Sequence, residues 1–284
     1  MRIDALFSQF KREKTYLGNV SPRTIKAYLD CERAYKRTVG DALPDKLNIK
    51  EFVMKLQESG IAVTTVNYYI RSLNSFLSWM LENEFIPERL RIKPLKEPEK
   101  VLKTFSDEQL KALLTWRPKT FYERRLHTMI ILIIDTGIRI DEALTLTREN
   151  VLFEDLLIKV TGKGSKERYV PISIECRKVL LKFLDRHPHR LVFATMAGAK
   201  LQYFNTLRYF KNHCKRLGIN GVRLSWHTLR HGYALNHVRE GGDVFSLQRI
   251  LGHSDLSVTK RYVGLTQEDL KLVHKKTSIL GRLK

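Results

Sequence analysis

Histidine, arginine and tyrosine side chains that could do chemistry gather in short motifs in the second half of the chain. In SWHTLRHGYAL, His227 and Arg230 are three residues apart, so a helix places them on one face. The pair suits an anionic group, because an arginine binds two oxygens while a histidine transfers a proton. In LGHSDLSVTKRY, Gly252 is expected to end a helix, with His253 before the next helix and Tyr262 near its end. Alone, each motif also fits an ordinary surface pair or a half-buried tyrosine.

Two further motifs add cationic side chains at glycine turns. In DTGIRIDEAL, Gly137 permits a sharp turn into a helix, Arg139 stands near its first turn, and Glu142 can orient that arginine. In TGKGSKER, glycines flank Lys163 at the tip of an expected β-hairpin, and Lys166 competes for the same role. Their ordinary alternatives are an exposed helical arginine and a solvated basic turn. A tyrosine nucleophile among these cations suits few reactions, of which attack on a DNA phosphate is the one we favour.

The chain resembles the tyrosine recombinase (integrase) family over roughly residues 103–270. The resemblance lies in five motifs and their order: GIRIDEAL, GKGSKER, HTLRH, LGHS and TKRY. The residues that match the catalytic set of that family are Arg139, Lys163, His227, Arg230, His253 and Tyr262. Lys163 is preferred to Lys166 because the lysine of the family is the first of the two. Glu142 and His231 are expected to support the site. Five motifs in the right order are hard to obtain by chance. Their combination therefore disfavours the ordinary structural alternatives that each motif allows alone.

The resemblance implies that Tyr262 attacks a scissile DNA phosphate, forms a 3′-phosphotyrosyl bond and releases a 5′-hydroxyl. A 5′-hydroxyl from a partner duplex then attacks that bond, and strands are exchanged through a Holliday junction. Because the covalent intermediate conserves the phosphodiester energy, we expect no ATP, no metal and no other cofactor. The sequence shows neither a nucleotide-binding loop nor a cluster of acidic metal ligands, in agreement with that expectation.

The resemblance also assigns roles to the other matched residues. Arg139 and Arg230 hold the non-bridging phosphate oxygens as charge builds in the transition state. His253 hydrogen-bonds one of these oxygens. Lys163 protonates the leaving 5′ oxygen, and His227 assists proton transfer with the tyrosine.

The charge balance of the chain points to a polyanion as its partner. It carries 51 Lys and Arg against 30 Asp and Glu, a formal net charge of +21. Such an excess favours nucleic acid, with an anionic membrane surface and a ribosome-associated role as the alternatives. The family resemblance implies that the nucleic acid is double-stranded DNA with specific core sites. The charged N-terminus is not a signal peptide, and the apolar run MIILIID is too short to cross a bilayer. Three distant cysteines without ligand or disulfide spacing favour reduced thiols in the cytoplasm. The resemblance implies that the protein is nucleoid-associated there.

Hydrophobic periodicity predicts a mainly α fold with a small β-hairpin or sheet (α+β) in two domains. Helical patterns over residues 1–92 predict a helical domain, which resembles the core-DNA-binding (SAM-like) domain of the family. Prolines and alternating charges mark a linker at 93–104. Ser106 caps the first helix of a catalytic domain over 105–284, where helices surround the hairpin on either side of GKGSKE.

Local signals also predict the ends of one helix and the exposure of three histidines. Ser21 is expected to cap a helix that Gly40 closes. His187, His189 and His213 belong to no motif, so we expect them at the surface.

The tail after Tyr262 has helical spacing and resembles the family segment that packs on a neighbouring protomer; docking on its own domain is the alternative. The resemblance implies a homo-oligomer on DNA, a tetrameric synapse with tail exchange, and accessory DNA-bending proteins. The basicity and the tail favour integration, excision or resolution for a mobile element, and Xer-type chromosome-dimer resolution is the alternative. Two other candidates are a non-cutting DNA-binding protein of the same fold and a type IB topoisomerase. The complete catalytic set disfavours the first, and the LGHS box with a separate helical domain disfavours the second.

Overall fold

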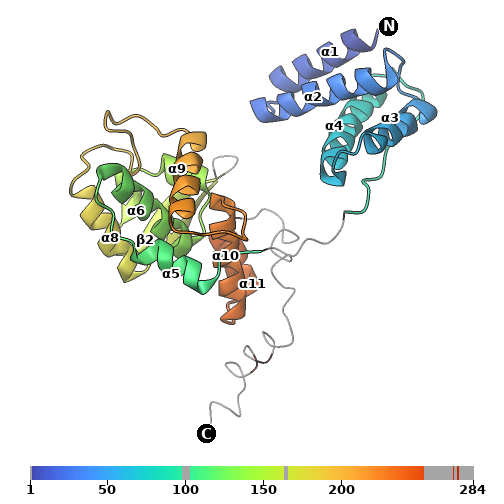
Figure 1. The fold of residues 1–284 in the computed structure, drawn as a ribbon. Coiled ribbons are helices and arrows are strands. Elements are labelled where there is room, and N and C mark those ends of the chain that lie inside the picture. Colours follow the sequence, from blue (N-terminus) through green and yellow to red (C-terminus); the bar gives the residue numbers. More distant parts are fainter. Residues whose placement is uncertain (1, 98–102, 163–165, 253–270, 272–273, 275–284) are drawn as a thin grey trace. The chain divides into compact units, whose positions relative to one another are not determined.

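The computed structural model describes residues 2–97, 103–162, 166–252, 271 and 274. The chain divides at residue 100 into two compact units. The first unit is helical, and the second combines helices with a small sheet (Figure 1). Within the described ranges, no helix is both long enough and apolar enough to cross a membrane.

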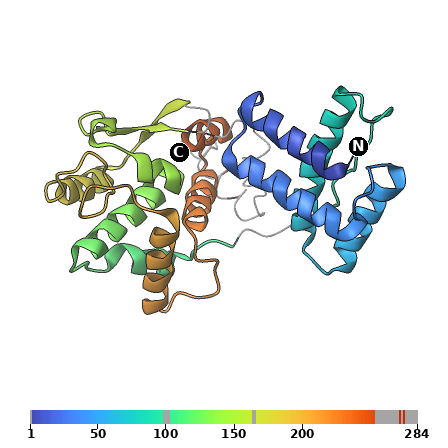
Figure 2. The ribbon, with the colours of Figure 1, turned by 90° about the horizontal axis from the view of Figure 1, so that it is seen from above.

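The described part of the first unit is built from helices packed around an aromatic core. These helices are α1 (Ile3–Tyr16), α2 (Pro22–Val39), α3 (Lys46–Glu58) and α4 (Val63–Glu82). Helices α1 and α2 lie side by side (Figure 2), and α2 also packs on α3 and α4. Phe7 of α1 stacks on Phe76 of α4, with ring centroids 3.8 Å apart. The Ser21 hydroxyl accepts a hydrogen bond from the backbone N–H of Thr24, and Gly40 ends α2 with φ 83°, so both predicted ends are confirmed.

The segment that follows α4 stays attached to the first unit through two asparagines. Asn74 exchanges hydrogen bonds with the backbone N–H and carbonyl of Ile92, at 2.9 and 2.8 Å. Asn67 does the same with Leu95, at 2.8 and 2.9 Å. The first residues of the predicted linker are therefore held against α4, and Leu95 packs on the apolar core.

The second unit surrounds the buried helix α6 with other helices on several sides. Its helices in the described ranges are α5 (Asp107–Thr115), α6 (Phe121–Thr136), α7 (Ile140–Thr145), α8 (Ile174–Leu184), α9 (Tyr203–Arg216), α10 (Trp226–Arg239) and α11 (Val244–Leu251). Ser106 begins α5 with a full capping box, as predicted. Helix α6 carries fully buried Ile130 and Ile133 and contacts α5, α8, α9 and α10, so it is the centre of the core.

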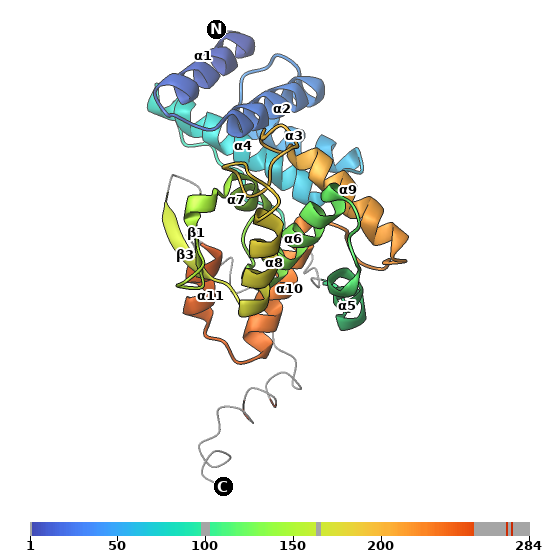
Figure 3. The ribbon, with the colours of Figure 1, turned by 90° about the vertical axis from the view of Figure 1, so that its left-hand side faces the viewer.

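A three-stranded antiparallel sheet lies at one side of this unit, in the order β1 (Val151–Leu152), β2 (Leu157–Thr161), β3 (Glu167–Pro171). Strands β2 and β3 form the predicted hairpin, with Val160 opposite Arg168. The short strand β1 was not predicted; it follows the 3₁₀ turn Arg148–Asn150. Helix α11 packs beside β3 (Figure 3), which brings residues far apart in the sequence together. The mainly helical fold with a small sheet confirms the predicted fold class.

The predicted surface position of two histidines is wrong. His187 and His213 are 2% and 3% exposed, whereas His189 is half-buried. The His187 ring packs between Phe121 and Phe183, and the His213 ring lies 3.8 Å from the ring of Trp116. Burial, followed by the charge of a neighbouring arginine, lowers the pKa of His213 to about 4, so it is neutral at pH 7 and tolerates the core.

Candidate active site

The turn between α6 and α7 sets the position of Arg139. Helix α6 ends at Gly137, whose φ of 64° is in the left-handed region. A Cβ at this position would lie 2.3 Å from the ring of Tyr233, so both the backbone angle and the close approach require glycine. The chain then turns at Arg139, which precedes the first residue of α7 and extends its side chain toward the end of α11.

Glu142 is a buried carboxylate that holds Arg139 at both its backbone and its side chain. It is 4% exposed. Its Oε2 accepts the backbone N–H of Arg139 at 2.8 Å, and its Oε1 accepts the guanidinium Nη1 at 3.0 Å. Burial acts to raise the pKa of Glu142, but hydrogen bonds and charges from Arg168 and Arg139 outweigh it and the pKa is lowered. Glu142 is therefore ionised at neutral pH.

Arg168 of β3 is the second cation on Glu142, and it was not among the residues predicted for the site. Its Nη1 and Nη2 donate to the two carboxylate oxygens at 2.8 and 2.9 Å, and its Nε donates to the carbonyl of Ile250 at 2.7 Å. The contact joins the sheet, α7 and α11. The signal that could have found Arg168 is its position, five residues after Lys163 on the strand that leaves the hairpin tip.

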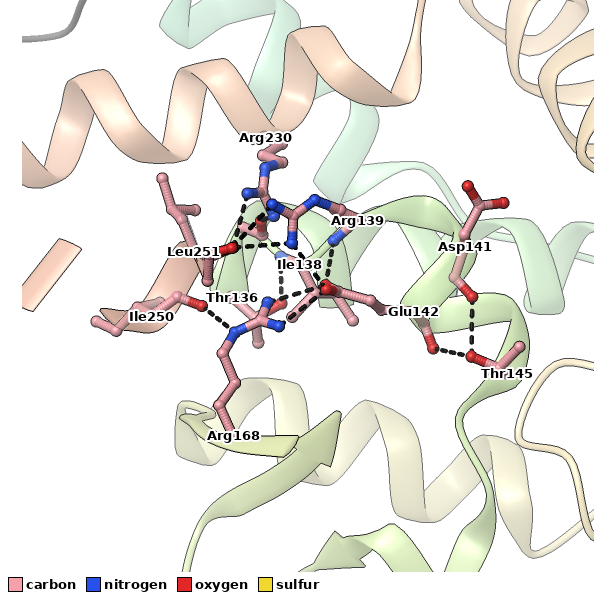
Figure 4. A network of polar contacts seen from close by, with 12 residues as sticks. Thr136, Ile138, Arg139, Asp141, Glu142, Thr145, Arg168, Arg230, Ile250 and Leu251 are labelled. Atoms are coloured by element: carbon pink, nitrogen blue, oxygen red, sulfur yellow. Dashed lines mark hydrogen bonds and ion pairs between the residues drawn. The ribbon is translucent and has the colours of Figure 1, made fainter. Parts of the chain in front are cut away.

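The guanidinium groups of Arg139 and Arg230 converge on one oxygen atom (Figure 4). Arg139 Nη1 and Arg230 Nη2 both donate to the carbonyl of Leu251, at 3.2 and 2.8 Å. Arg139 Nη2 also donates to the carbonyl of Gly252 at 3.0 Å, and Arg230 Nη1 to that of Gly137 at 2.7 Å. Arg230 is 4% exposed, whereas the Arg139 side chain is 33% exposed, so the pair is a cationic centre, open on the Arg139 side, that can bind an oxygen-rich anion.

His227 and His231 lie next to this centre on α10. Their ring centroids are 5.8 Å apart. Part of His227 is open to solvent, yet surrounding protein and then the charges of Arg230 and Arg139 lower its pKa. Since its ordinary value is 6.5, His227 is neutral at pH 7 and can accept a proton.

The remaining predicted residues lie at or beyond the edge of the described chain. Lys163, His253 and Tyr262 lie outside the described residues. Lys166 is exposed directly before β3, and its carbonyl accepts the N–H of Gly162 at 2.8 Å. The structure thus brings together Arg139, Glu142 and Arg230 with His227 and His231 alongside. It describes the residues directly before Lys163 and His253.

The fold is that of DNA recombinases and integrases. The chain matches the integrase of transposon Tn1549 in complex with a circular intermediate DNA, with a TM-score of 0.78 at 16% identity over 95% of this chain and 99% of the other. It matches the recombinase XerH bound to a difH substrate at 0.73, with 20% identity over 96% and 84% of the two chains. The lambda integrase dimer bound to a core site also matches at 0.73, with 17% identity over 91% and 97%.

The sequence comparisons define the family. The phage integrase family model matches residues 103–269. The tyrosine recombinase XerA of Thermococcus kodakarensis is 30% identical over 95% of both chains. The tyrosine recombinase XerD of Vibrio cholerae is 28% identical over 81% of this chain and 96% of its own. The chain belongs to the phage integrase family and is a site-specific tyrosine recombinase.

Proposed function

We propose that this chain cuts and rejoins DNA at specific core sites through a 3′-phosphotyrosyl bond to Tyr262. The phenolic oxygen attacks phosphorus and displaces the 5′ oxygen, which leaves as a 5′-hydroxyl. The phenolic proton goes to a base, and the leaving oxygen receives one from an acid. A 5′-hydroxyl from a partner duplex reverses these steps and exchanges strands through a Holliday junction. Because the phosphotyrosyl bond keeps the energy of the phosphodiester, the cycle needs no ATP hydrolysis.

The observation that carries the proposal is the meeting of Arg139 and Arg230 at one oxygen. Two guanidinium groups that share an acceptor are spaced to hold the non-bridging oxygens of a phosphate. Such an arrangement stabilises the charge that builds on a pentavalent phosphorus, without reorganisation during the reaction. Arg139 directly precedes α7 and Arg230 lies on α10, and both helices contribute residues to the core of the second unit.

We assign the proton transfers to residues that surround this pair. His227, neutral at pH 7, takes the proton of Tyr262 as the bond to phosphorus forms. Lys163 protonates the leaving 5′ oxygen; Lys166 is the alternative for that role. His253, which directly follows Gly252, hydrogen-bonds a non-bridging oxygen. Glu142 and His231 support the arginine pair and His227.

We further propose that residues 1–92 bind core DNA, that 93–104 link the domains, and that 105–284 form the catalytic domain. The active assembly is a tetrameric synapse on DNA in which C-terminal tails pass between protomers, aided by accessory DNA-bending proteins. The relatives of known fold include DNA complexes and a dimer on a core site, which supports a DNA-bound oligomer. The protein acts in the cytoplasm, on the nucleoid.

Two biological roles use this chemistry. The basicity and tail of the chain favour integration, excision or resolution for a mobile element. Similarity to XerA over 95% of both chains favours chromosome-dimer resolution. The location of the core site separates them: a site at the end of a mobile element supports the first role, and a single chromosomal site whose loss leaves dimeric chromosomes supports the second.

The test begins with selection of a core site from random duplexes bound by the full-length protein. The selected duplex is then nicked close to the cleavage position, so that the cut fragment diffuses away and the covalent complex accumulates. Wild-type protein is expected to form an adduct that survives a denaturing gel, and Tyr262→Phe is expected to form none. Tight, salt-sensitive binding without an adduct would instead support a non-cutting DNA-binding protein.

A further inference from the structure

We propose that Arg168 is a positioning residue of this active site, which holds Glu142, Arg139 and the end of α11 in their working arrangement. The proposal rests on the function proposed above. Arg168 is outside the catalytic set that the motifs define, and its guanidinium contacts groups from two other parts of the fold.

The contacts of Arg168 use the planar fork of the guanidinium. Two parallel bonds of 2.8 and 2.9 Å run to the carboxylate of Glu142. The Nε bond of 2.7 Å runs to the carbonyl of Ile250, next to the Leu251 carbonyl that Arg139 and Arg230 share. Since the Arg168 side chain is 14% exposed, solvent screens these contacts little. A lysine ammonium has the charge but lacks this fork, so it cannot make the three bonds in one plane.

Two glycines show how closely the chain approaches this guanidinium. A Cβ at Gly252 would lie 2.9 Å from Arg168 Cζ and Nη1, so any side chain there would have to displace the guanidinium. A Cβ at Gly162 would lie 3.6 Å from Arg168 Nη1 and from Glu142 Oε1. Gly162 directly precedes Lys163, and Gly252 directly precedes His253. Arg168 therefore lies against both chain segments that deliver these two residues to the site.

The Glu142 carboxylate is shared between Arg139 and Arg168, which explains why a second arginine must bind it. With Arg168 in place, each oxygen of Glu142 is divided between the two arginines, and Arg139 gives the carboxylate only one side-chain bond. Its Nη2 then points to the Gly252 carbonyl, beside the oxygen that it shares with Arg230. Without Arg168, the buried carboxylate would bind Arg139 with both oxygens, which would draw that guanidinium away from Arg230. We therefore expect loss of Arg168 to weaken phosphate alignment and leave the DNA-binding surface intact.

The test compares Arg168→Met and Arg168→Lys with wild type on the nicked duplex, with cleavage rate and duplex Kd measured separately. We expect Arg168→Met to lower the single-turnover rate about 10²-fold, as a displacement of about 1 Å does, with Kd nearly unchanged. Arg168→Lys should stay at least about tenfold below wild type, because a charge without the fork does not restore bidentate geometry. In the double variant Arg168→Met with Glu142→Gln, the fold-losses in cleavage rate should not multiply. Both changes remove the same interaction, the one between Arg168 and Glu142.

Arg125→Met is the matched control. Arg125 is a buried arginine, 7% exposed, whose guanidinium donates to the Ala194 carbonyl near the opposite end of α6. Its substitution is expected to lower the melting temperature and to leave the cleavage rate per folded molecule unchanged. Should Arg168→Met fail to fold, Arg168→Lys carries the test alone.

Other results of these experiments would contradict either the positioning role of Arg168 or the proposed function. Wild-type cleavage by Arg168→Lys, multiplied losses in the double variant, or an equal rate loss in Arg125→Met would each contradict the positioning role. A wild-type protein that forms no adduct would remove the proposed function and the role of Arg168 with it. An adduct formed equally by wild type and Arg168→Met would remove the positioning role alone.

Discussion

At the scale of single residues, the site depends on one carboxylate among cations. Glu142 is nearly inaccessible to solvent, and its charge is retained because Arg139 and Arg168 both bind it. The two arginines that converge on the Leu251 carbonyl take their positions from such neighbours. Changes at these residues should thus affect stability and catalysis through identifiable contacts.

Arg230→Lys should lower the single-turnover cleavage rate about 10²–10³-fold, the usual effect of removing one donor from a charge-stabilising site. A lysine keeps the charge but has a single nitrogen, so it cannot reproduce the planar fork whose Nη1 and Nη2 reach the Gly137 and Leu251 carbonyls. Rapid-quench cleavage of the nicked duplex measures the rate. Arg190→Lys is the control, because the Arg190 side chain is 77% exposed and pairs only with Glu149 among the described contacts. A rate for Arg230→Lys close to that of the control would contradict the assigned role.

Glu142→Gln should destabilise the protein by about 3 kcal/mol at pH 7, since it leaves two arginines around an uncharged buried group. The pKa of Glu142 is lowered on folding, so its ionised form contributes stability above the unfolded value of 4.5. That contribution is lost as pH falls through the lower folded pKa. Calorimetry of both proteins from pH 7 to pH 3 measures this: the difference should shrink only below pH 4.5. A difference that is constant with pH, or larger in acid, would refute it.

At the scale of elements, two helix ends and a hairpin must meet for the site to form. Helix α6 ends at Gly137, α11 ends at Gly252, and both glycines have φ 64°. At each of them a Cβ would lie under 3.0 Å from a neighbouring side chain, which would have to move. These ends place Arg139 and the segment that leads to His253 next to β3.

Gly252→Ala should therefore impair cleavage much more than a left-handed glycine elsewhere. The backbone strain costs about 1–2 kcal/mol, and the added methyl group must displace the Arg168 guanidinium. Gly218→Ala is the matched control in the same unit, since its φ is 69° and no atom lies within 4 Å of its Cβ position. Both variants should melt at lower temperature, but only Gly252→Ala should lose cleavage per folded molecule. Equal cleavage by the two variants would contradict the close packing at α11.

Local features of the fold could be predicted because their causes are local. Ser21 and Ser106 bond to backbone N–H groups three residues later, and Gly252 ends α11 within one turn. Strand β1 was missed because its two residues pair with β2 and carry no periodicity of their own. The burial of His213 was missed because it depends on Trp116, almost a hundred positions away.

In the site too, contacts between residues close in the sequence were predictable, and contacts between distant residues were not. The Arg139–Glu142 contact spans three positions on one helical turn, so the spacing predicted it. The Arg168–Glu142 and Arg168–Ile250 contacts join residues 26 and 82 positions apart. The first joins β3 to α7 and the second joins β3 to α11, and no sequence spacing reveals that these elements pack together.

At the scale of the whole molecule, the excess of basic side chains is the dominant property. A net charge of +21 opposes compaction of the protein alone and favours a densely charged polyanion. Contacts with DNA phosphates release condensed counterions, so affinity depends steeply on salt. The contribution of counterion release to affinity is independent of the DNA sequence, whereas the choice of a core site needs contacts with the bases.

Duplex affinity should fall about 10³–10⁵-fold between 50 and 200 mM salt, which corresponds to roughly six to ten phosphate contacts. Fluorescence anisotropy with a labelled duplex gives the slope of log Kd against log salt. A scrambled duplex should show a similar slope at weaker affinity, because phosphates are common to both. A slope near zero would exclude phosphate contacts as the main source of affinity.

The proposed mechanism depends above all on Tyr262 as the nucleophile. The most direct measurement is mass spectrometry of the trapped adduct after protease and nuclease digestion. We expect a nucleotide joined through its 3′-phosphate to the peptide that contains Tyr262, together with a free 5′-hydroxyl on the released strand. A nucleotide on any other residue, a 5′-linked phosphate, or no covalent product from a cleaved duplex would contradict it.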